Sequence, residues 1–201
     1  MMPDGNDKES RSEARQRLLT LRRAMSPEER GMRSARLVAN LHDAFRHIGC
    51  RTLGLYWPIR HETDLRIWAD RVSAERRISL ALPVVVERAA PIVYRAWKLG
   101  DDMVRGFWNI PVPARGGACQ PDVVIAPLVG FNGTFRLGYG GGYFDRTLAA
   151  AAQRPFAIGV GFDVMRAPAF EPRPHDIAMD VIVTDEAITW RDAHEAKMLR
   201  R

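Results

Sequence analysis

The sequence has no long hydrophobic run. A membrane-spanning helix needs about 18 or more consecutive apolar residues, and the best candidate, residues 78–86, is short and contains a serine and a proline. Cysteine is also scarce, because Cys50 and Cys119 are too few for a disulfide framework or a zinc cluster. Residues 1–16 mix acids with bases and lack the apolar segment of a secretion signal. We therefore expect no membrane association and a reducing, cytoplasmic location.

Positive charge is sparse in the part of the chain where a nucleic-acid surface would need it. The 201-residue chain carries a net charge of +6, of which residues 1–36 hold +3 and residues 191–201 hold +2. Proteins that bind nucleic acid usually gather basic residues and aromatics on one reading element. The distribution favours an anionic small-molecule ligand and argues against nucleic acid, with RNA binding as the alternative.

Two helices are predicted at the start of the chain. Ser10 and Ser26 each precede a glutamate by three residues, which is the pattern of a capped helix N-terminus, and a proline follows Ser26 at the first helical position. Leucines recur at helical spacing after both serines. The sequence therefore predicts helices over residues 11–25 and 27–47.

The rest of the chain has the pattern of an α/β protein. Helical spacing recurs at 64–76 and 144–152, and alternation of strands and helices predicts an α/β fold: a mostly parallel central sheet flanked by helices, in a single-domain three-layer sandwich. We expect this domain to span residues 9–190, between a disordered tail at 1–8 and a charged tail at 191–201. The expected strands, most of them apolar enough to be buried on both faces, are residues 52–57, 78–86, 91–97, 122–131, 156–162 and 179–184.

The least ordinary segment is the glycine-rich GTFRLGYGGGYFDR at residues 133–146. Dense glycine leaves backbone N–H groups unshielded, as a loop that wraps an anion before a helix N-terminus requires. Arg136, Tyr143 and Asp145 would add a charge clamp, an aromatic ring and an oxygen ligand for magnesium. The segment matches neither the P-loop nor the dinucleotide-binding fingerprint. The alternative is a tight turn in which Arg136 and Asp145 form a surface ion pair.

Three segments together resemble the 5-formyltetrahydrofolate cyclo-ligase family. They are RLGYGGGYFDR, the earlier GLYWPIRHETDLR, and the later IGVGF followed by PHDIAMDVIVTDEAI. The resemblance runs from Arg11 to about Ile188. It implies an enzyme that uses ATP as co-substrate and Mg2+ as cofactor to cyclise 5-formyltetrahydrofolate to 5,10-methenyltetrahydrofolate, releasing ADP and phosphate. Separately, we expect the protein to be a monomer.

The resemblance also implies which residues bind ATP and metal. Arg136, Tyr143 and Asp145 are the expected catalytic residues, and Asp145 and Asp176 are the expected magnesium ligands. Asp180 lies close enough in sequence to be the second carboxylate in place of Asp176. The expected ATP-binding residues are Arg11, Arg15, Arg136, Leu137, Gly138, Tyr139, Gly140, Gly141, Gly142, Tyr143 and Phe144.

The folate is expected to bind at Trp57 and Glu62. A buried carboxylate can accept the paired N–H donors of a pterin edge, and a large ring can stack beside it. The alternatives are a core tryptophan and an acid that leads into a helix, because Thr63 and Asp64 are typical helix-capping residues.

The sequence departs from the family pattern at Arg11, Tyr139, Gly141 and Phe144, where lysine, arginine, lysine and a second tyrosine occur in relatives. Part of the positive charge that relatives place next to the phosphates is therefore missing here. Two other functions stay open: a paralogue acting on a different metabolite, and a non-catalytic nucleotide- or RNA-binding module.

Overall fold

The computed structural model describes residues 9–192. Its first two elements are the helices α1, Arg11–Ala24, and α2, Pro27–Phe45, which confirms both predictions. The Ser10 side chain accepts a hydrogen bond from the backbone N–H of Glu13, whose carboxylate accepts one from the N–H of Ser10. These reciprocal bonds satisfy two N–H groups that the first turn cannot pair, so the chain enters the helix at a defined residue.

The centre of the fold is an eight-stranded sheet with the order β12-β11-β10-β7-β1-β2-β3-β6. The five strands from β11 to β2 are parallel, and antiparallel strands lie at both sides. The predicted α/β fold with a mostly parallel sheet is confirmed. The strands are β1 Thr52–Gly54, β2 Ser79–Val84, β3 Val93–Trp97, β6 Ala118–Cys119, β7 Val123–Pro127, β10 Phe156–Val160, β11 Val181–Val183 and β12 Ile188–Trp190.

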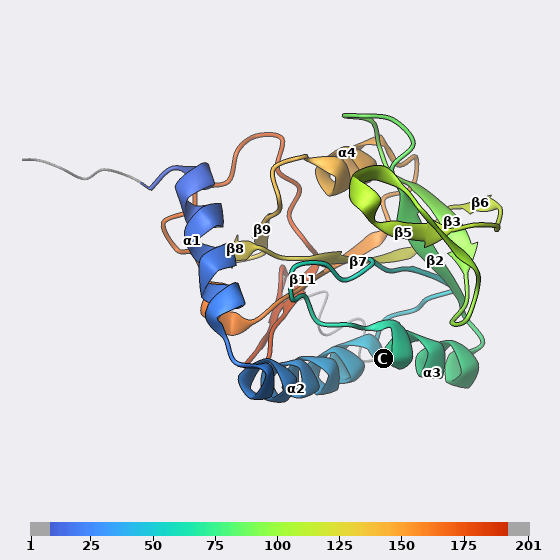
Figure 1. Cartoon of the computed structure of the whole chain (residues 1–201), viewed down its shortest axis with the longest axis horizontal. Coiled ribbons are helices and arrows are strands. Elements are labelled where there is room, and N and C mark those ends of the chain that lie inside the picture. Colours follow the sequence, from blue (N-terminus) through green and yellow to red (C-terminus); the bar gives the residue numbers. More distant parts are fainter. Residues whose placement is uncertain (1–8, 193–201) are drawn as a thin grey trace, which may run out of the picture.

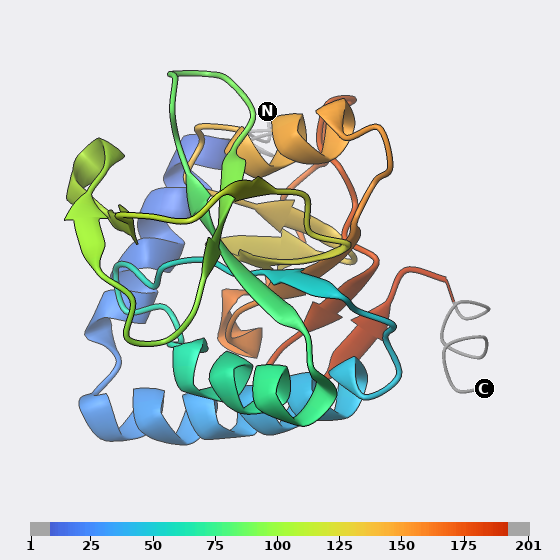
Figure 2. The ribbon, with the colours of Figure 1, turned by 90° about the vertical axis from the view of Figure 1, so that its right-hand side faces the viewer.

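Helices cover both faces of the sheet, which gives three layers. Helix α2 and helix α3, Arg66–Arg76, lie side by side under one face, and helix α4, Tyr143–Ala150, lies over the other (Figures 1 and 2). Successive side chains of β7 alternate between these layers. Val123 and Ile125 pack in the cluster that includes α2, whereas Val124 packs in the cluster that includes α4.

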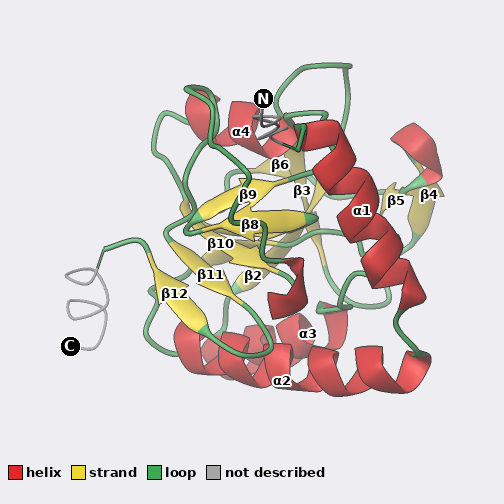
Figure 3. Ribbon diagram, turned by 90° about the vertical axis from the view of Figure 1, so that its left-hand side faces the viewer, coloured by secondary structure: helices red, strands yellow, loops and turns green. Residues whose placement is uncertain are grey.

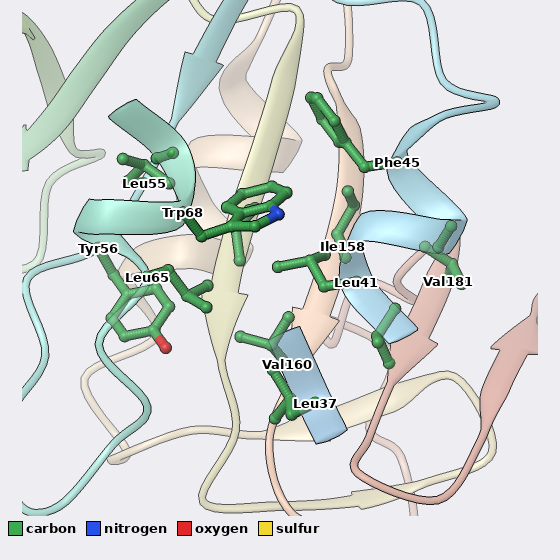
Figure 4. Packing of buried hydrophobic residues seen from close by; sticks show 14 of the residues in the cluster. Leu37, Leu41, Phe45, Leu55, Tyr56, Leu65, Trp68, Ile158, Val160 and Val181 are labelled. Carbon is green, nitrogen blue, oxygen red and sulfur yellow. The ribbon is translucent and has the colours of Figure 1, made fainter. Parts of the chain in front are cut away.

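The larger cluster forms where α2 and α3 meet the sheet (Figure 4). Leu37, Leu41 and Phe45 recur at helical spacing along α2 and are fully buried. The Phe45 ring meets the edge of Trp68 from α3, with ring centroids 5.4 Å apart. This packing joins the two helices and fixes them beneath the parallel strands.

The prediction of one continuous strand over residues 122–131 is wrong. Strand β7 ends at Pro127. Leu128 still donates its N–H to the Val160 carbonyl, but Val129 donates to Leu137, and the chain enters a separate hairpin of β8, Gly130–Asn132, and β9, Phe135–Leu137 (Figure 3). A second hairpin, β4 Met103–Arg105 and β5 Pro111–Pro113, was not predicted, nor were β6 and β12. Both hairpins lie beside the central sheet and contribute to the cleft described below.

Both predicted tails lie largely outside the described residues, which exclude 1–8 and 193–201. At the start of the predicted C-terminal tail, Arg191 donates its backbone N–H to the carbonyl of Asp180 at 2.8 Å. Within residues 9–192, none of the helices combines the length and the apolar character that crossing a membrane would require.

Candidate active site

A cleft of about 670 Å3 opens beside the carboxyl end of the sheet, between α1, the glycine-rich segment and the hairpin of β4 and β5. Of the predicted site residues, only Leu137 does not line it, because its side chain is buried in the hydrophobic cluster around α2. Tertiary structure therefore brings together segments up to 165 residues apart. The predicted residues in the cleft are Arg11, Arg15, Trp57, Glu62, Arg136, Gly138, Tyr139, Gly140, Gly141, Gly142, Tyr143, Phe144, Asp145 and Asp176.

The glycine loop, residues 138–142, joins β9 to α4. Gly140 has a φ of 97° and Gly142 a φ of 63°, which are left-handed conformations that side chains oppose. Gly142 caps α4 without a side-chain hydrogen bond, so backbone N–H groups of the first helical turn are available to an anion. The loop follows a strand end as predicted, but the strand is the hairpin strand β9 rather than β7.

Arginines from α1 approach the loop from one side. The Nε of Arg15 donates to the carbonyl of Gly138 at 2.8 Å. Burial lowers the pKa of Arg15, and the positive charges of Arg11 and Arg173 lower it further. Such crowding of cations raises their electrostatic energy, and a bound polyanion would relieve it.

Two carboxylates face these cations. Arg136 is buried and donates to Asp145 at 3.2 Å, so the predicted pair exists, although it lies in the cleft wall and not on the open surface. Asp176 accepts hydrogen bonds from both terminal nitrogens of Arg11, at 2.6 and 2.9 Å. Burial raises the pKa of Asp176, but bonds from Arg11 and from the N–H of Arg173 outweigh it and lower the pKa overall.

The structure also separates Asp176 from Asp180. The Asp180 carboxylate is buried away from the cleft, where it pairs with Arg154 at 2.8 Å and accepts the backbone N–H of Ala157 at 2.7 Å. Among residues 9–192, no three Asp, Glu, His or Cys side chains gather as a metal cage. Asp145 and Asp176 would suit Mg2+ only as one or two protein ligands beside phosphate oxygens and water, which is the shell that this ion prefers.

Glu62 lies in the wall of the cleft, at the end of a tight turn. Residues 59–62 form a turn in which Arg60 and His61 both have positive φ, at 47° and 65°, a costly conformation for residues other than glycine. The Glu62 carboxylate accepts the N–H of Ile59 at 2.9 Å and the hydroxyl of Tyr139 at 2.7 Å. Burial raises the pKa of Glu62 despite these bonds.

The alternative role of Glu62 as an acid leading into a helix does not match the structure. Helix α3 begins after Leu65, three residues further on, and Leu65 itself makes no side-chain cap hydrogen bond. The carboxylate at the helix start is that of Asp64, which accepts the backbone N–H of the first helical residue, Arg66, at 3.0 Å. Glu62 is one of the residues that line the cleft.

Aromatic rings complete the cleft. Trp57 is partly buried, and the Arg66 guanidinium lies 4.1 Å from its ring centroid. The sequence analysis did not single out Trp108, which is 59% exposed at the tip of the hairpin of β4 and β5 and meets Tyr143 edge to face at 5.4 Å. No local pattern marks Trp108, because the hairpin approaches the cleft only through tertiary folding.

Arg22 was also missed, although a signal for it exists. It lies seven residues after Arg15, which places both on one face of α1. Arg22 is 3% exposed and donates to the Tyr139 hydroxyl at 2.7 Å and to the Leu128 carbonyl at 3.0 Å. A charged residue among leucines on the buried face of a helix is the pattern that could have identified it.

Comparison with known proteins identifies the family of this chain. A model of the 5-formyltetrahydrofolate cyclo-ligase family matches residues 7–185. The chain belongs to this family. A 5-formyltetrahydrofolate cyclo-ligase of Mycoplasma pneumoniae is 38% identical over 68 residues, or 33% of this chain and 41% of that relative. One of Mycoplasma genitalium is 35% identical over 63 residues, or 31% of this chain and 38% of the relative. The aligned region thus spans less than half of either relative.

Solved structures extend the likeness of this family member to most of its length. The NMR structure of Aquifex aeolicus 5,10-methenyltetrahydrofolate synthetase matches with a TM-score of 0.78 and 28% identity over 91% of this chain and 94% of the other. A 5,10-methenyltetrahydrofolate synthetase from Mycoplasma pneumoniae matches with a TM-score of 0.73 and 22% identity over 88% and 99% of the two chains, which shows a common fold. The predicted family resemblance is confirmed.

Proposed function

We propose that the chain catalyses the ATP- and Mg2+-dependent cyclisation of 5-formyltetrahydrofolate to 5,10-methenyltetrahydrofolate, with release of ADP and phosphate. The observation that carries this proposal is the direct contact between two predicted sites. Tyr139 of the glycine loop donates its hydroxyl to Glu62, the expected folate carboxylate, at 2.7 Å. A phosphate donor on the loop and a folate on Glu62 would therefore share one cleft.

The chemistry requires such proximity. The N5-formyl carbon is a poor electrophile because the nitrogen lone pair is delocalised into the carbonyl, and the oxygen is a poor leaving group. Transfer of the γ-phosphoryl group to the formyl oxygen makes that oxygen part of a leaving phosphate. N10 then forms a bond to the same carbon and loses its proton to water, and the carbon–oxygen bond breaks with departure of phosphate. Positioning and charge stabilisation suffice for this sequence, without a covalent enzyme intermediate.

The residues of the cleft match these needs. The glycine-loop N–H groups, Arg15 and Arg136 would stabilise the charge of the phosphates and of the transferred phosphoryl group. Each oxygen of Glu62 already accepts one hydrogen bond and has a second lone pair for a pterin N–H. Trp57 would stack beside the bicycle.

Asp145 and Asp176 would hold Mg2+ on the phosphate side, where the ion supplies charge stabilisation for phosphoryl transfer. Each carboxylate is paired with an arginine in the described structure. For Asp176, the bonds from Arg11 and from the N–H of Arg173 lower the pKa, which favours the ionised form that binds a metal ion. Asp176 lines the cleft and Asp180 does not, which supports the assignment of Asp176 as the second carboxylate.

The deciding experiment follows methenyltetrahydrofolate by its absorbance after purified enzyme is mixed with 5-formyltetrahydrofolate, ATP and Mg2+. We expect product only when all three are present, with one ADP for each methenyl product. ATP binding without turnover would favour the non-catalytic module, and turnover of another formylated metabolite alone would favour the paralogue. Gel filtration of the same preparation would test the expected monomer, and fractionation of the source cells the expected cytoplasmic location.

A further inference from the structure

Arg22, Tyr139 and Glu62 form one hydrogen-bonded chain through three separate segments. Arg22 is on α1, Tyr139 is in the glycine loop, and Glu62 ends the turn at residues 59–62. The guanidinium donates to the Tyr139 oxygen at 2.7 Å, and the Tyr139 hydroxyl donates to Glu62 at 2.7 Å. The three groups therefore connect the glycine loop directly to the turn that holds Glu62.

The direction of this chain is fixed by the chemistry of its members. A guanidinium can only donate hydrogen bonds, so the bond from Arg22 occupies Tyr139 as an acceptor. The single hydroxyl proton of Tyr139 is then directed to the carboxylate, which in its ionised form can only accept. Arg22 thus orients the tyrosine hydroxyl, and the tyrosine orients the carboxylate.

A buried arginine is a costly way to fill space. Arg22 is 3% exposed, and its Nε has no hydrogen-bond partner within the described part of the chain. An apolar side chain of similar length would pack there without the cost of desolvating a charge. What only the arginine supplies is the pair of directed bonds, one to Tyr139 and one to the Leu128 carbonyl just before the β8–β9 hairpin.

The loop backbone and the Glu62 carboxylate are connected through the Tyr139 side chain. Gly138 and Gly140 flank Tyr139, and the carbonyl of Gly138 accepts the Nε of Arg15. An anion that orders the loop would hold the Tyr139 hydroxyl at the carboxylate, and a ligand that fixes Glu62 would in turn hold the loop. Linkage requires the effect to be equal in both directions.

We propose that Arg22 and Tyr139 are positioning residues that couple the two substrates, so that ATP bound at the glycine loop and folate bound at Glu62 strengthen one another's binding. The proposal rests on the proposed function for the identity of both ligands. Neither residue takes part in phosphoryl transfer. Arg22 acts entirely through the Tyr139 hydroxyl.

The test measures the dissociation constant of 5-formyltetrahydrofolate by calorimetry, with and without a non-hydrolysable ATP analogue and Mg2+. In the wild type we expect the analogue to tighten folate binding by about fivefold or more, the range typical of coupled sites. In Tyr139→Phe, which keeps the ring and removes only the hydroxyl, and in Arg22→Met, the ratio should fall to nearly one.

Arg76→Met is the matched control, because Arg76 also donates to backbone carbonyls, but at Phe45 and Ile48, away from the bond that Arg22 makes to Tyr139. It should retain the wild-type ratio even if its melting temperature falls. Three results would overturn the proposed coupling while leaving the enzymatic function intact. They are a wild-type ratio of one, an unchanged ratio in Tyr139→Phe, and an equal loss of coupling in Arg76→Met. Absence of folate binding by the wild type would instead refute the proposed function and this proposal with it.

Discussion

The guanidinium of Arg11 donates hydrogen bonds to both carboxylate oxygens of Asp176, at 2.6 and 2.9 Å, although the two residues are 165 positions apart in the chain. The contact ties the first turn of α1 to the segment that follows β10, and both partners line the cleft. Because the bond is bidentate and the Asp176 side chain is only 5% exposed, it should stabilise the fold more than a surface ion pair does.

Replacing Arg11 by methionine should therefore remove about 1 kcal/mol of stability at pH 7. The folded-state pKa of Asp176 is lowered, so the pair stabilises the protein above the unfolded pKa of an aspartate, about 3.9. This stabilisation is lost as the pH falls through the folded pKa. Urea unfolding at pH 7 and pH 3 should show the gap between variant and wild type closing in acid.

Arg17→Met is the control for that change. Arg17 holds Glu9 with a similar bidentate geometry, at 2.7 and 2.8 Å, but its side chain is 53% exposed. Its loss should cost clearly less than the loss of Arg11. Equal costs for the two variants would show that burial of the Asp176 pair contributes nothing.

Gly140→Val should abolish ATP binding. Valine opposes a φ of 97°, and its Cβ would meet the Arg15 guanidinium at 3.4 Å. Gly100→Val is closely matched, because Gly100 has a φ of 93° and open space around its Cα, but it does not line the cleft. Both variants should unfold at similarly reduced temperatures, and only Gly140→Val should lose nucleotide binding in calorimetry. Normal ATP affinity in Gly140→Val would exclude the loop as the phosphate site.

Asp145→Asn should lower turnover by about a hundredfold while folate affinity changes little. A neutral amide is a weaker Mg2+ ligand, and the charge matters most during phosphoryl transfer. Steady-state rates over a range of Mg2+ concentrations would measure the effect. Asp180→Asn provides the contrast: it should destabilise the fold by about 3 kcal/mol or more by breaking a buried pair with Arg154, with the Mg2+ dependence of the remaining folded enzyme unchanged. The assignment of Asp145 fails if its variant keeps the wild-type rate and Mg2+ dependence.

Glu62→Gln should weaken binding of 5-formyltetrahydrofolate about tenfold to a hundredfold, or roughly 1.5–3 kcal/mol, because an NH2 group would meet a pterin donor. ATP affinity should barely change. Calorimetry on this variant and on Glu29→Gln, which alters a glutamate of α2 that pairs with Arg33, would test the assignment. Equal folate affinities in the wild type and Glu62→Gln would remove Glu62 from the substrate site.

The same variant has a predicted pH signature. Burial raises the folded-state pKa of Glu62, so the folded protein binds more protons there than the unfolded chain does. The resulting stabilisation is present below the unfolded pKa, about 4.3, and is lost as the pH rises through the folded pKa. The melting temperature of Glu62→Gln relative to that of the wild type should therefore rise between pH 4 and pH 8. A difference that stays constant over this range would contradict the prediction.

Local patterns in the sequence were enough to predict several elements. Helices α1 and α2 begin at the residues that their capping serines indicate, because a cap and the face of a helix involve residues only three or four positions apart. The glycine loop was recognisable for the same reason: its backbone freedom is a property of consecutive residues. The family resemblance added the expectation that this loop binds ATP and that Trp57 and Glu62 bind folate in the same enzyme.

Long-range contacts decided the rest. The break after Pro127 depends on the hairpin that β8 forms with β9, and the choice between Asp176 and Asp180 depends on which carboxylate Arg11 reaches. Tyr139 lies 77 residues from Glu62 and 117 from Arg22. The helices, most of the strands and the glycine loop could be predicted from local patterns, because hydrophobic spacing, caps and glycine conformations act over a few residues, whereas Arg11, Arg15, Trp57, Glu62 and Asp176 were implied by the family resemblance. How these residues pair is visible only in the folded chain, because a hydrogen bond depends on distance and direction in space, which neighbours in the chain do not specify.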